Sequence, residues 1–452
     1  MTSSKSTKRA LLTSVLALLM CVTMLIGTTF AWFTDTASTG VNKIVSGNLK
    51  VDIIGADSDS HIEKLNFTKA ATTDAEAGAE ILWEPGCRYL TEGFRIANKG
   101  NLALKWKAQV NTGTTAANEG NFDLLDVIDF YLVTKAADGT ETETALDEFT
   151  GNLKKTETSD VYYIKGVMQT TAGNDYQGLT LDGITITVVA TQDTVENDSF
   201  NNQYDKDAKY PVVVSNQQQA NDAITNATDR QVNISVAPGQ TVTLDNGIAN
   251  AGDNSRDVTF IGNGSQTVDV ITHAVSAEGG QLNYQRGSSF TFENLTIQAG
   301  EGNFDGIVCD ELTFKNCTIQ GKLTLFGKAT FIDCTFDNTM ANQYSIWTWG
   351  GTDVTFEGCT FNTNGKAILL YGSAPTNLVV NNCTFNDRNN GSAEKAAIEI
   401  GNDYNATYTL TVNSATVNGF AAGKNTNSTL WANKNSMDAA HLTVTINGSK
   451  VQ

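Results

Sequence analysis

The second half of the sequence repeats one short pattern of hydrophobic and polar positions. In each copy apolar and polar residues alternate, an Asn or another turn-forming residue interrupts the alternation, and two apolar residues then alternate again. Six copies follow one another, at Phe292–Ile297, Phe314–Ile319, Phe331–Phe336, Phe356–Phe361, Val380–Phe385 and Val412–Val417. The distance between successive copies varies from 17 to 32 residues. A fixed motif with variable connections is typical of solenoid proteins, in which each repeat forms one coil.

Each repeat predicts a coil of three short strands around an apolar interior. The apolar residues of Leu312–Phe314 share one face of a strand, and Asn316 tolerates the left-handed backbone that a sharp bend requires. The Asn-x-Thr triplets look like glycosylation acceptors, but their fixed place in the repeat favours bends. A further short strand precedes each motif, at Ile307–Cys309, Leu323–Gly327, Ile346–Gly350, Ile368–Gly372 and Ile398–Gly401.

Four cysteines occupy the same position of the repeat, namely Cys317, Cys334, Cys359 and Cys383. Stacked strands lie about 4.8 Å apart, which is within reach of a disulfide, but parallel stacked side chains point the same way and suit a disulfide poorly. The sequence here also lacks the Cys-x-x-Cys or Cys/His spacing of a metal site. We therefore expect a structural ladder of buried thiols that behave as small apolar residues.

This pattern resembles the right-handed parallel β-helix of the pectate-lyase-like superfamily. The resemblance extends from about Val212 to the C-terminus and rests on the strand pattern, without a catalytic motif. Ser215 is expected to cap a short helix that runs through Ala227. Such a helix would shield the first strand edges of the β-helix.

Residues 1–31 have the features of a secretion signal. A basic start is followed by the apolar run Ala10–Gly27 and by small residues that end at Ala31. The apolar run is close to the length that spans a bilayer, so a retained membrane anchor is the alternative.

Five segments of the N-terminal part form a recognisable set, namely Thr29–Asp35, Ser46–Val51, Trp83–Gly86, Phe94–Leu104 and Ile184–Gln192. Within them, Asn98–Asn101 is expected to form the turn of a hairpin. Together they resemble the TasA/camelysin family of biofilm-fibre proteins from Gram-positive bacteria. The resemblance implies a jelly-roll sandwich and cleavage between Ala31 and Trp32 by a signal peptidase of the SipW type. It also implies self-assembly through an N-terminal donor strand anchored by Trp32 and Phe33.

The sequence thus predicts an all-β protein, with an N-terminal jelly-roll sandwich followed by a right-handed parallel β-helix. The expected segments are residues 1–31 for the signal peptide, 32–196 for the TasA-like domain, 197–211 for an acidic, Asn-rich linker, and 212–452 for the β-helix with its N-terminal helix.

Charge and histidine content narrow the possible functions. The formal net charge of −19 removes the electrostatic basis for binding nucleic acid or an anionic membrane surface. Some camelysin relatives are classed as metallopeptidases, but His61, His273 and His441 form no His-Glu-x-x-His pair. We therefore expect no metal and no cofactor.

Pectate-lyase-like enzymes place their active sites on the outward face of the strand that precedes each motif. Here that face offers two carboxylates, Asp310 and Glu399, which four coils separate by about 19 Å. A glycosidase needs its acid and base about 5 to 9.5 Å apart, and no Arg lies on this face to support a calcium-dependent lyase. We therefore expect that the chain is not an enzyme. The alternative is an active site built from loop residues such as Asp387, Arg388, Glu394 or Asp403.

The same outward face carries a strip of large side chains. Phe326, Trp349 and Tyr371 occupy one position of three successive coils, and Trp347 and Leu369 lie in a parallel row two residues earlier. Contiguous apolar surface marks contact sites, and a flat aromatic row suits the C–H faces of sugar rings. The alternative is that the strip is covered, by residues 338–344, by the sandwich or by a second copy.

We expect a secreted cell-surface or biofilm-matrix protein, whose TasA-like module assembles or attaches and whose β-helix binds a glycan or surface ligand. The expected partners are further copies of the chain, such a ligand, and a signal peptidase during export. The alternatives are a carbohydrate-active enzyme on a matrix module and a purely structural matrix subunit.

N-terminal sequencing and intact-mass analysis of the secreted protein test the signal peptide. We expect a mature chain that begins at Trp32, because the resemblance to the TasA/camelysin family implies cleavage between Ala31 and Trp32. A mature chain that still contains Leu16–Gly27 would instead indicate a membrane anchor.

Overall fold

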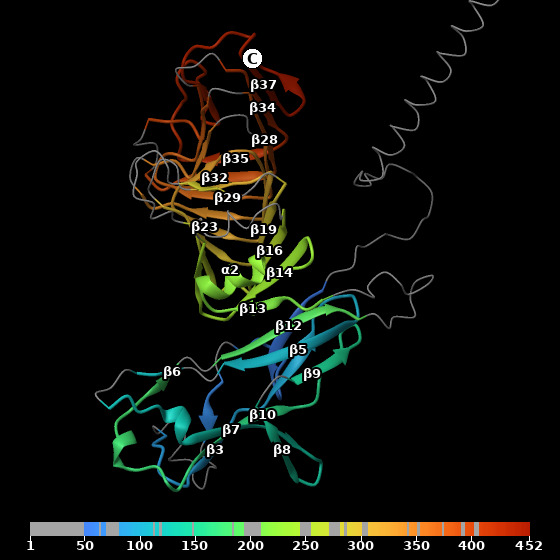
Figure 1. Cartoon of the computed structure of the whole chain (residues 1–452). Coiled ribbons are helices and arrows are strands. Elements are labelled where there is room, and N and C mark those ends of the chain that lie inside the picture. The colour runs from blue at the N-terminus through green and yellow to red at the C-terminus, as the bar shows by residue number, and fades with distance from the viewer. Residues whose placement is uncertain are drawn as a thin grey trace, which may run out of the picture. The chain divides into compact units, whose positions relative to one another are not determined.

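The computed structural model describes residues 49–452 with short gaps, and the described chain is all-β, as predicted (Figure 1). The gaps are residues 63–64, 69–80, 112–113, 117–119, 147–148, 183–184, 194–208, 245–254, 271–280, 284–286, 301–305, 341–342, 350–352, 373–374, 390–393 and 402–405. The expected signal peptide and donor strand therefore lie outside the described residues.

Residues 51–192 form antiparallel sheets that share one apolar core. One sheet contains β1 (Val51–Gly55), β4 (Phe94–Asn98), β10 (Tyr162–Met168), β3 (Arg88–Thr91) and β2 (Phe67–Thr68), with β7 (Ile128–Lys135) and β8 (Glu141–Ala145) continuing from β10. The second contains β12 (Thr185–Gln192), β5 (Leu104–Asn111) and β9 (Phe149–Leu153). Smaller elements are the pair β6 (Thr114–Thr115) and β11 (Leu181–Asp182) and the 3-10 helices η2 (Leu124–Asp126) and η3 (Asn174–Tyr176). Buried residues of both sheets, among them Phe94 and Trp106, belong to one cluster, so the sheets form a sandwich.

The turn predicted at Asn98–Asn101 connects the two sheets instead of the two strands of a hairpin. β4 ends at Asn98 in one sheet, whereas β5 begins in the other. The buried Asn98 amide donates hydrogen bonds to the carbonyl oxygens of Leu102, Leu153 and Lys154 at 2.7, 3.4 and 3.1 Å. These bonds hold the chain where it crosses between the sheets, and a local turn pattern does not specify them.

The described residues between 212 and 450 form a parallel β-helix whose strands stack into three longer sheets and one two-stranded sheet (Figure 1). The long sheet contains β13 (Val212–Val214), β14 (Gln231–Val236), β16 (Asp257–Ile261), β19 (Ser289–Glu293), β22 (Glu311–Lys315), β25 (Lys328–Ile332), β28 (Asp353–Glu357), β31 (Thr376–Asn381), β34 (Tyr408–Val412), β37 (Leu442–Ile446) and the antiparallel β38 (Ser449–Lys450). The middle sheet contains β15 (Thr241–Thr243), β17 (Thr267–Asp269), β20 (Thr296–Gln298), β23 (Thr318–Gln320), β26 (Thr335–Asp337), β29 (Thr360–Thr363), β32 (Cys383–Asp387) and β35 (Ala415–Asn418). The short sheet contains β24 (Leu323–Leu325), β27 (Ile346–Thr348), β30 (Ile368–Leu370), β33 (Ile398–Ile400) and β36 (Trp431–Asn433), and β18 (Gln281–Asn283) pairs with β21 (Gly306–Val308).

The bend between the long and middle sheets has the left-handed backbone that the repeat predicts. Asn294, Asn316, Asp333 and Asn382 have φ angles of 57°, 50°, 52° and 53°. Gly358 takes this position in its coil, with φ of 64°. Asn, Asp and Gly adopt this conformation at low cost, which explains why they take the interrupting position in the first five copies of the motif, whereas the sixth copy has Ser414 with φ of 126°.

Stacked phenyl rings fill the interior of the coils. Phe314 and Phe331 lie 4.8 Å apart between ring centroids, and so do Phe331 and Phe356. A second stack joins Phe336, Phe361 and Phe385 at 4.2 and 4.7 Å. All of these rings are fully buried. The ring spacing matches the strand spacing of a sheet because each coil repeats the same inward position.

The four ladder cysteines lie directly after the bends. Cys317, Cys334, Cys359 and Cys383 are buried, and each is a free thiol. Each sulfur lies 3.3 to 3.4 Å from the carbonyl oxygen of the residue two positions earlier, so the thiol donates a weak local hydrogen bond.

A short helix, α2 (Gln217–Thr225), packs at the first coils of the β-helix (Figure 1). Ala220 and Ile224 are buried in the same cluster as the β-helix core. The N-cap is Asn216, one residue after the expected Ser215, and its side chain accepts a hydrogen bond from the Gln219 N–H at 3.0 Å.

The phenyl stack leads to a prediction about stability. Phe331→Ala should reduce the free energy of unfolding by about 3 to 5 kcal/mol, because it removes a fully buried ring from the stack. Phe331→Leu should cost less, since it keeps most of the apolar volume. Urea unfolding followed by circular dichroism gives these values. The control is Thr330→Ala on the outward side of the same strand, which should change stability by at most about 0.5 kcal/mol. Equal losses for Phe331→Ala and Thr330→Ala would contradict the role of the stack.

Candidate functional site

In-register pairing places equivalent residues of successive coils in rows on the outward side of the short sheet. One row contains Thr324, Trp347, Leu369, Glu399 and Ala432. Two residues further along each strand, a second row contains Phe326, Trp349, Tyr371, Gly401 and Lys434. We call these two rows together the short-sheet face.

Three aromatic side chains form a cluster on this face. Trp349 and Tyr371 are stacked, with centroids 5.7 Å apart and planes 19° apart. Trp347 meets both rings edge-on, at 6.0 Å from Trp349 and 5.4 Å from Tyr371. The buried Thr348 hydroxyl donates to the Tyr371 carbonyl oxygen at 3.0 Å and accepts from the Tyr371 N–H at 2.9 Å, which fixes the backbone under the cluster. Phe326 turns toward the preceding coil, where a Cβ on Gly306 would lie 3.1 Å from its ring.

The short-sheet face is only partly accessible. Phe326, Trp347, Trp349 and Tyr371 are half-buried. Leu369, Thr324 and Glu399 occupy outward positions but are 6%, 0% and 2% exposed. Alternation along a strand specifies the direction of a side chain, whereas the cover over it comes from other segments.

Tyr344 provides part of this cover. It lies in the turn before β27, and its phenol donates a hydrogen bond to the Glu399 carboxylate on β33, two strands further along the short sheet. The buried Leu369 on β30 lies between Trp347 and Glu399 in the same outward row. Burial and the negative charge of Glu399 raise the pKa of Tyr344, so the phenol keeps its proton at neutral pH.

Lysine side chains surround these aromatic and acidic groups. Lys322 is 1% exposed, and its ammonium group lies 4.9 Å from the centre of the Trp347 ring. The Lys366 ammonium lies 5.3 Å from the Tyr344 ring. Lys395 forms an ion pair with Glu399, with Nζ and Oε1 3.6 Å apart. Burial and the positive charges of Lys395 and Lys434 lower the pKa of Lys366, against the opposing effect of Glu399.

Two of the loop residues considered as catalytic alternatives, Asp387 and Arg388, belong to the middle sheet or follow it directly. Asp387 is 9% exposed on the middle sheet and accepts a hydrogen bond from the Asn389 N–H at 2.8 Å. Arg388 forms an ion pair with Asp337, also on the middle sheet. Glu394 is exposed. Asp403 lies outside the described residues.

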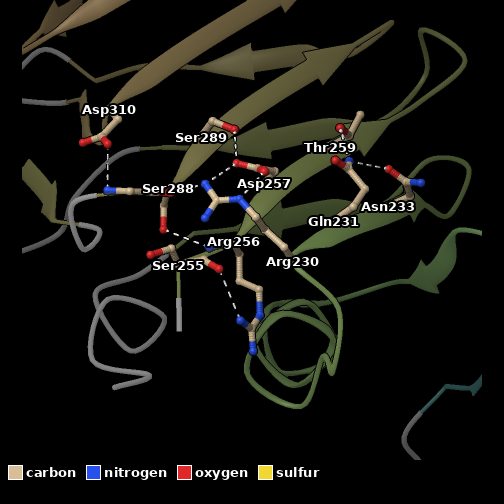
Figure 2. A network of polar contacts seen from close by, with 11 residues as sticks. Arg230, Gln231, Asn233, Ser255, Arg256, Asp257, Thr259, Ser288, Ser289 and Asp310 are labelled. Carbon is tan, nitrogen blue, oxygen red and sulfur yellow. Dashed lines mark hydrogen bonds and ion pairs between the residues drawn. The ribbon is translucent and has the colours of Figure 1, made fainter. Parts of the chain in front are cut away.

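A second polar network occurs where the first coils begin (Figure 2). Arg230 donates to the Asp257 carboxylate at 2.6 and 3.1 Å and to the Gly287 carbonyl oxygen at 2.6 Å. Ser289 also donates to Asp257, at 2.8 Å, and the Gly287 N–H donates to Asp310 at 2.7 Å. These bonds connect four successive coils of the long sheet, so we interpret the network as structural. They also engage Asp310, the outward carboxylate that the sequence placed four coils from Glu399.

The described histidines bind neighbouring carboxylates. His61 lies 2.6 Å from Asp52, and His441 lies 2.8 Å from Asp438. Among the described residues, no group of three or more His, Cys, Asp or Glu side chains is placed to hold a metal ion. Within the same part of the chain, no helix has the length and apolar character needed to cross a membrane. Ala31, Trp32 and Phe33 precede the described residues, so signal cleavage and the donor strand stay predictions.

Residues 260–437 match the model of a protein family described as right handed beta helix region. No curated protein matches the chain. Among solved structures the chain is similar to catalytic domains of a GH87 α-1,3-glucanase. One is a variant in complex with tetrasaccharides (12% identity, 88% of this chain, 98% of that chain, TM-score 0.18) and another is a complex with nigerose (12%, 88%, 98%, 0.17). The family model confirms the right-handed β-helix that the sequence predicts, while none of these matches is to the TasA/camelysin family.

The expectation that the chain is not an enzyme is contradicted, because the solved structures similar to it are catalytic domains. At these TM-scores the likeness assigns no role to any residue. The prediction that the chain is not an enzyme considered only the carboxylates at outward strand positions. It did not consider residues of the turns, which bring Tyr344, Lys366 and Lys395 close to Glu399.

Proposed function

We propose that the protein is carbohydrate-active and binds a polysaccharide across the short-sheet face. The aromatic cluster of Trp347, Trp349 and Tyr371 is the observation that carries the proposal. Its rings are half-buried, so they are held in place while part of each remains accessible. Carbohydrate sites combine such apolar surfaces with a few fixed polar groups, which Glu399 and the neighbouring lysines supply here.

The second row continues beyond the aromatic cluster. After Trp349 and Tyr371 it contains Gly401, which is buried beside Lys434 and Asn435, and then Lys434. Neighbouring positions of this row lie about 4.8 Å apart, so the row suits an extended chain of sugar rings.

Catalysis at the same face is favoured by the group of Tyr344, Glu399 and Lys366. General acid–base catalysis needs a proton donor and a proton acceptor close to the bound substrate, with pKa values that suit the working pH. Glu399 is a buried carboxylate with a phenol bound to it. The lowered pKa of Lys366 makes its ammonium group a better proton donor. We propose that activity depends most on Glu399, whose carboxylate would become accessible to the substrate when the Tyr344 phenol moves away from it.

The proposal also includes the export and the self-assembly that the sequence predicts. We propose that the chain is exported and that its N-terminal part, through the segment beginning at Trp32 and Phe33, attaches it to other copies in an extracellular matrix. The support is the sequence of the signal region and the TasA-like motifs. In this arrangement the β-helix would act on, or hold, a polysaccharide of the matrix or of a cell surface.

Replacing Trp349 tests the binding site. Trp349→Ala should weaken binding to the polysaccharide by about tenfold, because it removes one ring of the stack. Trp349→Phe should retain most of the affinity, since it keeps an aromatic ring at this position. Affinity electrophoresis against a panel of soluble polysaccharides measures the effect, and melting temperatures show whether folding is intact. If Trp349→Ala binds as tightly as the parent protein, the ligand does not use the cluster.

Replacing Glu399 tests catalysis. The parent protein is expected to release reducing ends from at least one polysaccharide of the panel. Glu399→Gln should lower that rate by about 100-fold or more, because it removes the carboxylate but keeps the shape of the side chain. Glu357→Gln, at an exposed position of the long sheet, is the control and should leave the rate unchanged. A parent protein that binds a polysaccharide but yields no product from any of them would leave only the binding function.

A further inference from the structure

The charge of the short-sheet face differs from that of the whole chain. The chain carries 49 Asp and Glu against 30 Lys and Arg, for a formal net charge of −19. On the short-sheet face and in the turns beside it, Glu399 is accompanied by Lys322, Lys366, Lys395 and Lys434. An acidic protein that gathers lysines next to an aromatic cluster has a local surface suited to a negatively charged ligand.

These lysines have different roles. Lys322 is buried against the Trp347 ring, so it positions that ring and is too enclosed to meet a ligand. Lys366 and Lys434 are partly exposed, and the Lys395 side chain is 35% exposed. These three can therefore contact a ligand that lies on the face.

The placement of the three accessible lysines follows the aromatic cluster. Lys434 continues the row of Trp349 and Tyr371, two strand spacings or about 10 Å beyond Tyr371. Lys366 lies over the Tyr344 ring, and Lys395 lies beside Glu399 on the preceding turn. A chain of sugars stacked on the aromatic rings would thus present its substituents to ammonium groups.

Three positive charges and one carboxylate lie close together here. Lys395 pairs with Glu399, whose carboxylate also accepts the Tyr344 hydrogen bond. Burial and the positive charges of Lys395 and Lys434 disfavour the charged form of Lys366. A bound anion would relieve the repulsion, so its interaction with the three lysines would be stronger than with isolated surface lysines.

We propose that the ligand of the short-sheet face is an acidic polysaccharide, whose carboxylate or sulfate groups bind Lys366, Lys395 and Lys434 while its sugar rings contact Trp349 and Tyr371. This inference rests on the proposed carbohydrate-binding function and specifies its ligand class. Recognition of this kind uses lysine ammonium groups directly and needs no bridging cation.

The test compares acidic and neutral polysaccharides on the full mature chain. Alginate and chondroitin sulfate serve as acidic probes, and dextran and a soluble mixed-linkage glucan serve as neutral ones. Isothermal titration calorimetry at low and at physiological ionic strength should show preferential binding of an acidic probe. That binding should weaken as salt is added, because salt screens the charges.

A pair of double variants separates local charge from net charge. Lys366→Gln with Lys434→Gln should weaken binding of the acidic probe by about tenfold or more, since each lysine donates a charged hydrogen bond. Lys328→Gln with Lys450→Gln changes net charge equally at exposed positions of the long sheet and should bind like the parent. Thermal unfolding confirms that both variants are folded.

The possible results distinguish this inference from the proposed function. If the parent binds a neutral polysaccharide as tightly as the acidic ones, and Trp349→Ala abolishes that binding, carbohydrate binding stands and the acidic ligand is excluded. If the two double variants bind the acidic probe equally well, the lysines of this face do not recognise it, and the inference is overturned. If no polysaccharide of either kind binds, the proposed function fails as well.

Discussion

The in-register stacking of parallel strands is the constraint on which the rest of this structure depends. Every coil must place its apolar side chains at the same positions as the next, which brings Phe314, Phe331 and Phe356 into a stack with 4.8 Å between centroids. Burying one such ring contributes up to about 3 kcal/mol, so the stack is a large source of stability. Residues with a left-handed backbone conformation, such as Asn316, turn the chain from the long sheet to the middle sheet at the same position of successive coils.

The same constraint builds the candidate site. Outward rows follow the register of the inward rows, so a rigid core also fixes Trp347, Trp349 and Tyr371 relative to one another. The turns between strands are free to vary in length without disturbing these rows. Tyr344 and Lys366 come from such turns. The site therefore combines a fixed aromatic platform with polar groups whose identity the fold does not prescribe.

The net charge of the chain and the lysines of the short-sheet face have opposite effects on a negatively charged ligand. Salt screens the repulsion between a chain of net charge −19 and other polyanions beyond about a Debye length of 8 to 10 Å. Inside that distance the local arrangement dominates, and on the short-sheet face Lys366, Lys395 and Lys434 define it. Overall charge therefore argues against non-specific binding of polyanions, while a specific site for an acidic sugar chain remains physically consistent.

The sequence by itself determined the all-β class, the coil repeat, the left-handed bends and the inward rows, because alternation and turn chemistry are local properties of the chain. It also placed Trp347, Leu369 and Glu399 on the outward side of their strands. Only the tertiary structure decided that the turn after Asn98 crosses between sheets, that Leu369 is covered, and that Tyr344 binds a carboxylate 55 residues away. Alternation specifies where a side chain points, whereas its neighbours are set by contacts between segments that are distant in the chain.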